Sequence, residues 1–153
     1  MRSSRIGRRW NISTIEATFL KGEIECGIPT RSKRALQTVC HFYRNGGSII
    51  PAELNAFENA ILGALNSGAS DEKVRRWSLS ALSNLGRKAT CWATILAIIS
   101  RYPDEPQVVS AAIAALFKLD LGEAQAAIAG QDLLAPELLV LSALQTRPAQ
   151  IWI

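Results

Sequence analysis

The organisation of the chain is decided by the stretch from Asp71 to Leu85, which reads DEKVRRWSLSALSNL. Its apolar residues recur at the three- and four-residue spacing that places them on one face of an α-helix. The same pattern returns 34 residues later: Val74 corresponds to Val108, Leu79 to Ile113, Ala81 to Ala115, Leu82 to Leu116 and Leu85 to Leu119. We interpret the two segments as copies of one helical unit.

Each copy follows residues that favour the start of a helix. Acidic side chains there complement the positive end of the helix dipole, and proline fits the first turn, where its missing N–H is not needed. The third start belongs to a further copy, in which the LSAL of residues 79–82 recurs at residues 141–144. The three starts read Ser70-Asp71-Glu72, Pro103-Asp104-Glu105-Pro106 and Ala135-Pro136-Glu137.

One more helix is predicted between the first two copies, over residues 88–102, with Trp92, Ile95, Leu96 and Ile99 on one side. A two-helix unit of about 34 residues that stacks on its neighbours forms an α-solenoid. The sequence therefore predicts an all-α fold of stacked helical hairpins. Trp77 and Trp92 fall on the apolar faces of their helices, so we expect both to belong to the core.

The segment from Asp71 to Gly86, D-x-x-V-R-x-x-x-L-x-A-L-x-x-L-G, resembles the second helix of a HEAT or HEAT-like repeat. The resemblance implies a short right-handed α-solenoid of about three to four HEAT-like hairpins. It also implies that Arg75 pairs with an acidic residue of a neighbouring repeat. Val109 stands where the next copy would carry such an arginine, so the ladder of Asp and Arg residues typical of the family is interrupted there.

The domain organisation follows from this periodicity. We predict a flexible basic arm over residues 1–10 and a single helical-repeat domain over 11–153, with the clearest repeats at 51–86, 88–120 and 121–147. A loop is predicted over 22–29. Further helices are predicted over 11–20, 31–43, 51–65, 121–129 and 136–145.

Composition excludes several classes of protein. The 153 residues are 48% hydrophobic and only 20% charged, which favours a folded chain over a disordered one. The most apolar window, residues 91–100, is too short to cross a bilayer, and no secretory leader is indicated, so we expect no membrane contact. Three cysteines do not form a disulfide framework, and we therefore expect a cytoplasmic protein.

No enzyme, metal site or cofactor site is predicted. His41 is the only histidine and follows Cys40, but neighbouring side chains on a helix point about 100° apart, which does not suit a nucleophilic pair. The other cysteines, Cys26 and Cys91, lack the C-x-x-C spacing of a zinc site. We expect buried or half-buried thiols and a surface imidazole.

The favoured function is a non-enzymatic protein–protein interaction or scaffold module. Residues 51–153 are close to neutral, and the chain ends on Ile151, Trp152 and Ile153, which form a candidate partner interface or a site of self-association. The same tail could instead cap the last repeat, or the chain could be the beginning of a longer protein.

The alternative is a nucleic-acid-binding repeat protein. Residues 1–50 carry nine Lys or Arg side chains against three Glu, so the basic character belongs to the N-terminal third. In this hypothesis the arm over residues 1–10 is an electrostatic tether. The candidate phosphate contacts are Arg31, Lys33, Arg34, Arg44, Arg75 and Arg76.

Overall fold

The computed structural model of the chain describes residues 14–67 and 70–129, and within them the side chains of 15–67 and 70–126. This part of the chain is all-helical, as the sequence predicts, and contains no strand. Its helices are α1 (Thr14–Ile24), α2 (Pro29–Arg44), α3 (Pro51–Asn66), α4 (Glu72–Leu85), α5 (Lys88–Arg101), α6 (Pro106–Leu119) and α7 (Leu121–Ala129).

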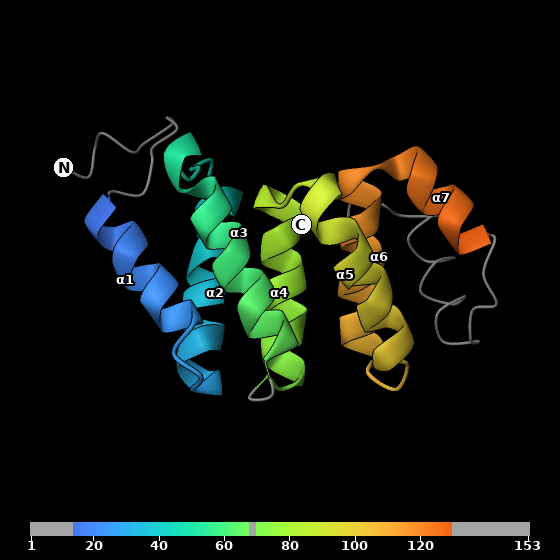
Figure 1. Ribbon diagram of the computed structural model, residues 1–153, viewed down its shortest axis with the longest axis horizontal. Coiled ribbons are helices and arrows are strands. Elements are labelled where there is room, and N and C mark those ends of the chain that lie inside the picture. Colours follow the sequence, from blue (N-terminus) through green and yellow to red (C-terminus); the bar gives the residue numbers. More distant parts are fainter. Residues whose placement is uncertain (1–13, 68–69, 130–153) are drawn as a thin grey trace.

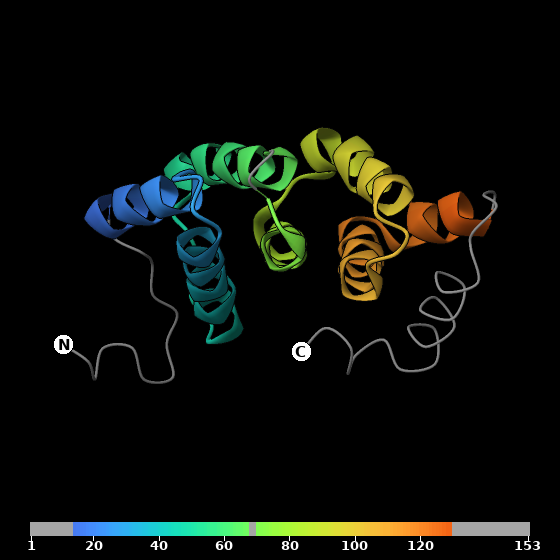
Figure 2. The same ribbon diagram turned by 90° about the horizontal axis from the view of Figure 1, so that it is seen from below.

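The helices follow one another along the long axis of the molecule (Figure 1). Seen from below, α1, α3 and α5 form an outer row and α2, α4 and α6 an inner row, and both rows curve so that the inner row lies on the concave side (Figure 2). Each outer helix packs against the inner helix that follows it, and α4 packs against both α2 and α6. The concave face is therefore built from three helices that are distant in sequence.

Local sequence accounts for where these helices begin. Asp71 is the N-cap of α4, and its carboxylate accepts a hydrogen bond from the Val74 backbone N–H at 2.8 Å. Helices α2, α3 and α6 each begin with proline in the first turn. The turn after α2 contains Gly46 at φ +87°, a backbone conformation that favours glycine.

One hydrophobic core runs through the described helices. It includes Leu82 of α4 and Leu116 of α6, the corresponding residues of the two sequence copies, and both are fully buried. Trp77 and Trp92 are half-buried and pack against this core, in agreement with the sequence prediction. These apolar positions are thus hidden from water, which is the main source of stability for a helical fold of this kind.

The boundaries differ from prediction mainly at α1. The predicted loop over residues 22–29 is wrong in its first part, because α1 continues to Ile24. Ile24 is 1% exposed, and its carbonyl oxygen accepts a hydrogen bond from Ser32 Oγ at 2.9 Å, so this last turn is tied to α2. The predicted arm over 1–10, the helix over 136–145 and the end of the 121–147 repeat lie outside the described residues.

A buried carboxylate joins α3 to the start of α5. Glu58 is 1% exposed, and its oxygens accept hydrogen bonds from Arg87 N (2.7 Å), Thr90 Oγ1 (2.6 Å) and Cys91 Sγ (3.0 Å). Arg87 Nη2 donates a further bond at 3.0 Å. Glu58 thereby satisfies the free N–H at the N-terminus of a helix that belongs to the next hairpin.

Ser78 offers a simple test of the packing around α4. Its side chain is fully buried, and among the described residues its Oγ is a buried polar atom without a hydrogen-bond partner. Because an unsatisfied buried hydroxyl costs free energy, we expect Ser78→Ala to leave stability unchanged or raise it by about 1 kcal/mol. Urea denaturation of the variant would measure this, and a loss above that size would show that the hydroxyl has a partner.

Candidate functional site

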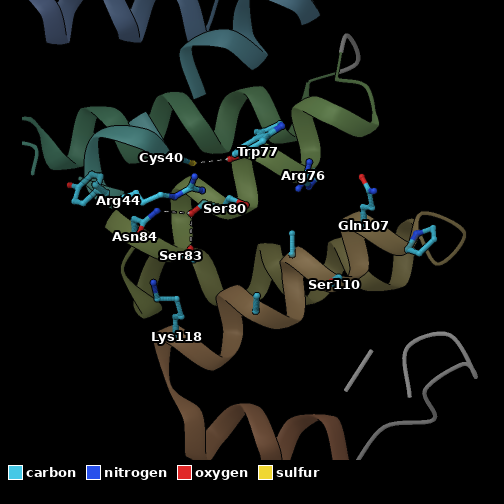
Figure 3. Close-up of a pocket in the computed structure, with 14 residues that line it drawn as sticks. Cys40, Arg44, Arg76, Trp77, Ser80, Ser83, Asn84, Gln107, Ser110 and Lys118 are labelled. Carbon is cyan, nitrogen blue, oxygen red and sulfur yellow. Dashed lines mark hydrogen bonds between the residues drawn. The ribbon is translucent and has the colours of Figure 1, made fainter. Parts of the chain in front are cut away.

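A hollow on the concave face, which we call the inner groove, lies between α2, α4 and α6 and has a volume of about 600 Å³. Figure 3 shows its residues: Arg44 extends from α2 toward α4, Lys118 lies on α6, and Arg76 lies on α4 at the opposite end beside Gln107. Its neutral polar side chains are Ser80, Ser83, Asn84, Gln107 and Ser110.

The charged side chains that line the inner groove are all positive. Arg44, Arg76 and Lys118 line it, whereas none of its described lining residues is Asp or Glu. None of these three cations forms an ion pair within the described part of the chain. Burial raises the pKa of the Cys40 thiol at the edge of the groove to about 12, and the charges of Arg44 and Arg76 oppose that rise, so the positive potential of both arginines reaches this point.

A second hollow of about 570 Å³ continues the inner groove over α2. The two share Cys40, Arg44 and Trp77, and the second adds Arg34 and the exposed His41. Its described lining also lacks a carboxylate. The basic surface therefore extends along α2 as well as across the three inner helices.

The carboxylates that are paired do not line this surface. Glu105 is bound by Arg75, Glu58 by Arg87, and both Asp120 and Glu123 by Lys88. Near the N-terminal hairpin, Lys21 binds Glu53 at 2.7 Å and Arg31 binds Glu23. Among the described residues, Lys21, Arg31, Arg75, Arg87 and Lys88 are paired with carboxylates, whereas the cations that line the two hollows are not.

Arg75 and Arg76 are adjacent in sequence but have different surroundings. Arg75 is 8% exposed, and its guanidinium makes two hydrogen bonds to Glu105, Nε–Oε1 at 2.9 Å and Nη2–Oε2 at 2.6 Å. Nη1 donates to the Ser70 carbonyl oxygen at 3.0 Å, and the group lies 4.0 Å from the centre of the Tyr102 ring. The predicted pairing of Arg75 with an acidic residue is confirmed, since Glu105 is the N-cap residue of α6, and Arg75 does not line the groove.

The other residues predicted to contact phosphate also divide into those that line the two hollows and those that do not. Arg34, Arg44 and Arg76 line the basic surface, whereas Arg31 is bound to Glu23 and Lys33 is half-buried and lines neither hollow. Lys118 was missed by the sequence analysis, although the 34-residue repeat aligns it with Asn84, another residue of the groove. Ile151, Trp152 and Ile153, the candidate partner interface, lie outside the described residues.

The aromatic side chains of the inner groove are already engaged. Arg76 covers the Trp77 ring with its guanidinium carbon 4.8 Å from the ring centre, and the ring packs against the core. Tyr43 also packs against the core, and its hydroxyl accepts a hydrogen bond from Ile49 N at 3.2 Å. The surface that the groove offers to a ligand therefore consists of cations, polar groups and the small apolar side chains of Pro106, Ala111 and Ala114.

Chemically reactive groups are not gathered in the groove. Burial raises the pKa of the Cys91 thiol to about 11, as it raises that of Cys40, which keeps both thiols protonated and weak as nucleophiles. Over residues 14–67 and 70–129 no cluster of His, Cys, Asp and Glu side chains is suited to hold a metal ion. No helix in the same ranges has the length and apolar character needed to cross a membrane.

Comparison with known proteins gives no further guide. No protein-family model, curated protein or solved structure matches the chain.

Proposed function

We propose that this chain is a non-enzymatic binding module whose inner groove holds an anionic partner chain. The observation that carries the proposal is the presence of Arg44, Arg76 and Lys118 in one groove whose described lining has no carboxylate. A concave surface of one charge sign attracts ligands of the opposite sign and speeds their association.

The proposal includes an architecture, a short right-handed α-solenoid of HEAT-like hairpins. The succession of hairpins α1–α2, α3–α4 and α5–α6 supports it, as does the contact of each inner helix with the next. The bond from Arg75 to Glu105 also supports it, because Asp71 and Glu105 are the N-caps of α4 and α6 and occupy equivalent positions 34 residues apart. We place the protein in the cytoplasm, where free thiols such as those of Cys26, Cys40 and Cys91 persist.

The side chains that line the inner groove indicate which kind of partner it binds. Protein partners are usually anchored by aromatic or apolar side chains in desolvated pockets. The inner groove instead offers cations, hydroxyls and amides beside the small side chains of Pro106, Ala111 and Ala114, with its two aromatic rings packed against the core. This arrangement supports a ligand recognised by its negative charge.

A protein–protein contact away from the groove is the second candidate function. It is favoured by Ile15 and Phe19 of α1, which are 83% and 64% exposed and lie one helical turn apart. If such a contact exists, Phe19→Lys should weaken it without changing the charge of the inner groove. A comparison of the oligomeric state or partner capture of the unchanged protein and the Phe19→Lys variant would show this weakening.

Retention on immobilised heparin, a polyanion, tests the proposed function. We expect the protein to bind at low salt, and a variant with Arg44, Arg76 and Lys118 all replaced by glutamine to elute at clearly lower salt, because electrostatic binding depends on the number of contacting cations. Elution of the triple variant together with the unchanged protein would refute the role of the groove. Circular dichroism of both proteins would confirm that the substitutions leave the fold intact.

A further inference from the structure

The cations of the inner groove are arranged across the helices rather than along one of them. Arg44 is the last residue of α2, Lys118 is the next-to-last residue of α6, and Asn84 holds the corresponding place on α4. In Figure 3 these three residues lie on the same side of the groove, and Arg76 lies on the other side. A ligand that meets all of the cations must therefore cross the three inner helices.

The inner groove spans more than a single small anion needs. Packed helix axes are about 8–10 Å apart, so the axes of α2 and α6 are separated by two such steps, on the order of 16–20 Å. Phosphates along one strand of a duplex advance by about 3.4 Å per nucleotide. The groove therefore spans several consecutive phosphates of an extended polymer.

The neutral polar side chains of the groove are of the kind that contact nucleic-acid backbones. Ser80, Ser83, Asn84 and Ser110 line the same groove as Arg76 and Lys118 and carry hydroxyl or amide groups. Such groups, together with Arg and Lys, make most hydrogen bonds to phosphate and sugar oxygens in complexes with nucleic acid. Apart from Trp77 and Tyr43, which pack against the core, the apolar side chains of the groove are the small Pro106, Ala111 and Ala114, whereas protein partners are usually anchored by large aromatic or apolar residues.

The aromatic residues distinguish a duplex from a single strand. Proteins that hold single strands stack the unpaired bases on exposed aromatic rings. Trp77 is covered by Arg76, and Tyr43 is fixed by its bond to Ile49 N, so the groove has no free stacking platform among its described residues. A duplex keeps its bases stacked inside and presents its phosphates outward, which matches a surface of cations and hydrogen-bonding groups.

We infer that the partner of the inner groove is a nucleic-acid duplex, held through its phosphate backbone across α2, α4 and α6. This inference rests on the proposed function and names the class of its anionic partner. Binding by phosphate contacts alone carries little sequence preference. Asn84 is the uncharged position in the row between Arg44 and Lys118, and its side chain is exposed.

The test measures binding of the full chain to a fluorescently labelled 20-base-pair DNA duplex by anisotropy between 50 and 200 mM salt. Contacts from Arg34, Arg44, Arg76 and Lys118 give an expected slope of log K against log salt of about −3 to −4, since each phosphate contact contributes roughly −0.9. Arg76→Gln or Lys118→Gln should weaken binding about fivefold to tenfold near 100 mM salt and make the slope shallower by about 0.9. Asn84→Lys should have the opposite effect of similar size.

Arg101→Gln is the matched control. Arg101 is exposed at the end of α5 in the outer row, and it lines neither hollow. Arg101→Gln makes the same change of charge outside the groove. The affinity of this variant for the duplex should therefore stay within about twofold of that of the unchanged protein, with a similar salt slope. An Arg101→Gln effect equal to that of Arg76→Gln, or a failure of Asn84→Lys to tighten binding, would overturn the inference.

The remaining outcomes separate this inference from the proposed function. If the groove cations retain the protein on heparin but the protein does not bind the duplex, the inference of a duplex partner fails. The proposed function, a module that binds an anionic partner, then stands. Tighter binding of the single-stranded 20-mer than of the duplex would overturn the assignment of a duplex. Binding of polyglutamate with the same dependence on Arg76 and Lys118, in the absence of duplex binding, would identify an acidic protein segment instead.

Discussion

Replacement of Glu58 by alanine is expected to lower the free energy of unfolding by about 3 kcal/mol, because it removes a buried acceptor from several donors at once. The backbone N–H of Arg87 and the thiol of Cys91 lose their partner, and both belong to the first turn of α5 or its N-cap. The exposed Thr90 hydroxyl and the Arg87 guanidinium can turn to water, which limits the loss. Urea denaturation followed by circular dichroism would measure the change.

Two further variants make this prediction specific. Glu58→Gln keeps the shape and one acceptor oxygen, so we expect about half of the loss. Asn59→Ala changes the exposed neighbour on the same helix and should alter stability by no more than about 0.5 kcal/mol. Equal losses from Glu58→Ala and Asn59→Ala would show that the interactions at the start of α5 do not stabilise the protein.

The same carboxylate predicts a dependence on pH. Burial alone would raise the pKa of Glu58, but hydrogen bonds from Thr90, Arg87 N and Cys91 outweigh it and lower the pKa from 4.5 to about 2. A lowered folded-state pKa means that the stabilisation is present above pH 4.5 and is lost as the pH falls toward 2. The difference in stability between the unchanged protein and Glu58→Gln should therefore shrink between pH 5 and pH 3, and a constant difference would contradict the assigned interactions.

The repeat predicted more of the structure than any single motif did. Apolar positions 34 residues apart located α4 and α6, and the N-cap Asp71 located the start of α4 within one residue. The repeat also contains the groove, because Arg76, Trp77, Ser80 and Asn84 of α4 correspond to Ser110, Ala111, Ala114 and Lys118 of α6, and all of them line it. Alignment of the solvent-facing positions as well as the apolar ones would have identified Lys118 from the sequence.

Other features depend on contacts that local sequence does not specify. Glu58 has the appearance of a surface carboxylate in its own helix, and its partners lie 29 to 33 residues away on another hairpin. The excess of positive charge on the concave face also depends on contacts between helices that are distant in sequence. It arises because Glu105, Asp120 and Glu123 bind Arg75 and Lys88, and only the packing of the helices shows which cations remain unmatched.

Arg75 carries the second large expected effect. Arg75→Ala should lower the free energy of unfolding by about 3 kcal/mol, since it leaves the Glu105 carboxylate without its partner and removes two charge-assisted hydrogen bonds. The Ser70 carbonyl oxygen and the Tyr102 ring also lose a contact. Arg75→Lys keeps the charge but cannot reproduce the two parallel bonds to Glu105, so we expect an intermediate loss.

A double-mutant cycle tests whether this loss belongs to the contact between hairpins. Glu105→Ala alone should also be costly, because it leaves the guanidinium of Arg75 buried without a carboxylate. The double variant should cost less than the two single losses together, with a coupling of about 1.5–3 kcal/mol. Additive losses would show that the pair contributes nothing beyond its separate side chains.

Arg76→Gln in the next position should leave stability within about 0.5 kcal/mol, because Arg76 makes no ion pair within the described residues. The adjacent arginines would then separate stability, which depends on Arg75, from ligand binding, which we assign to Arg76.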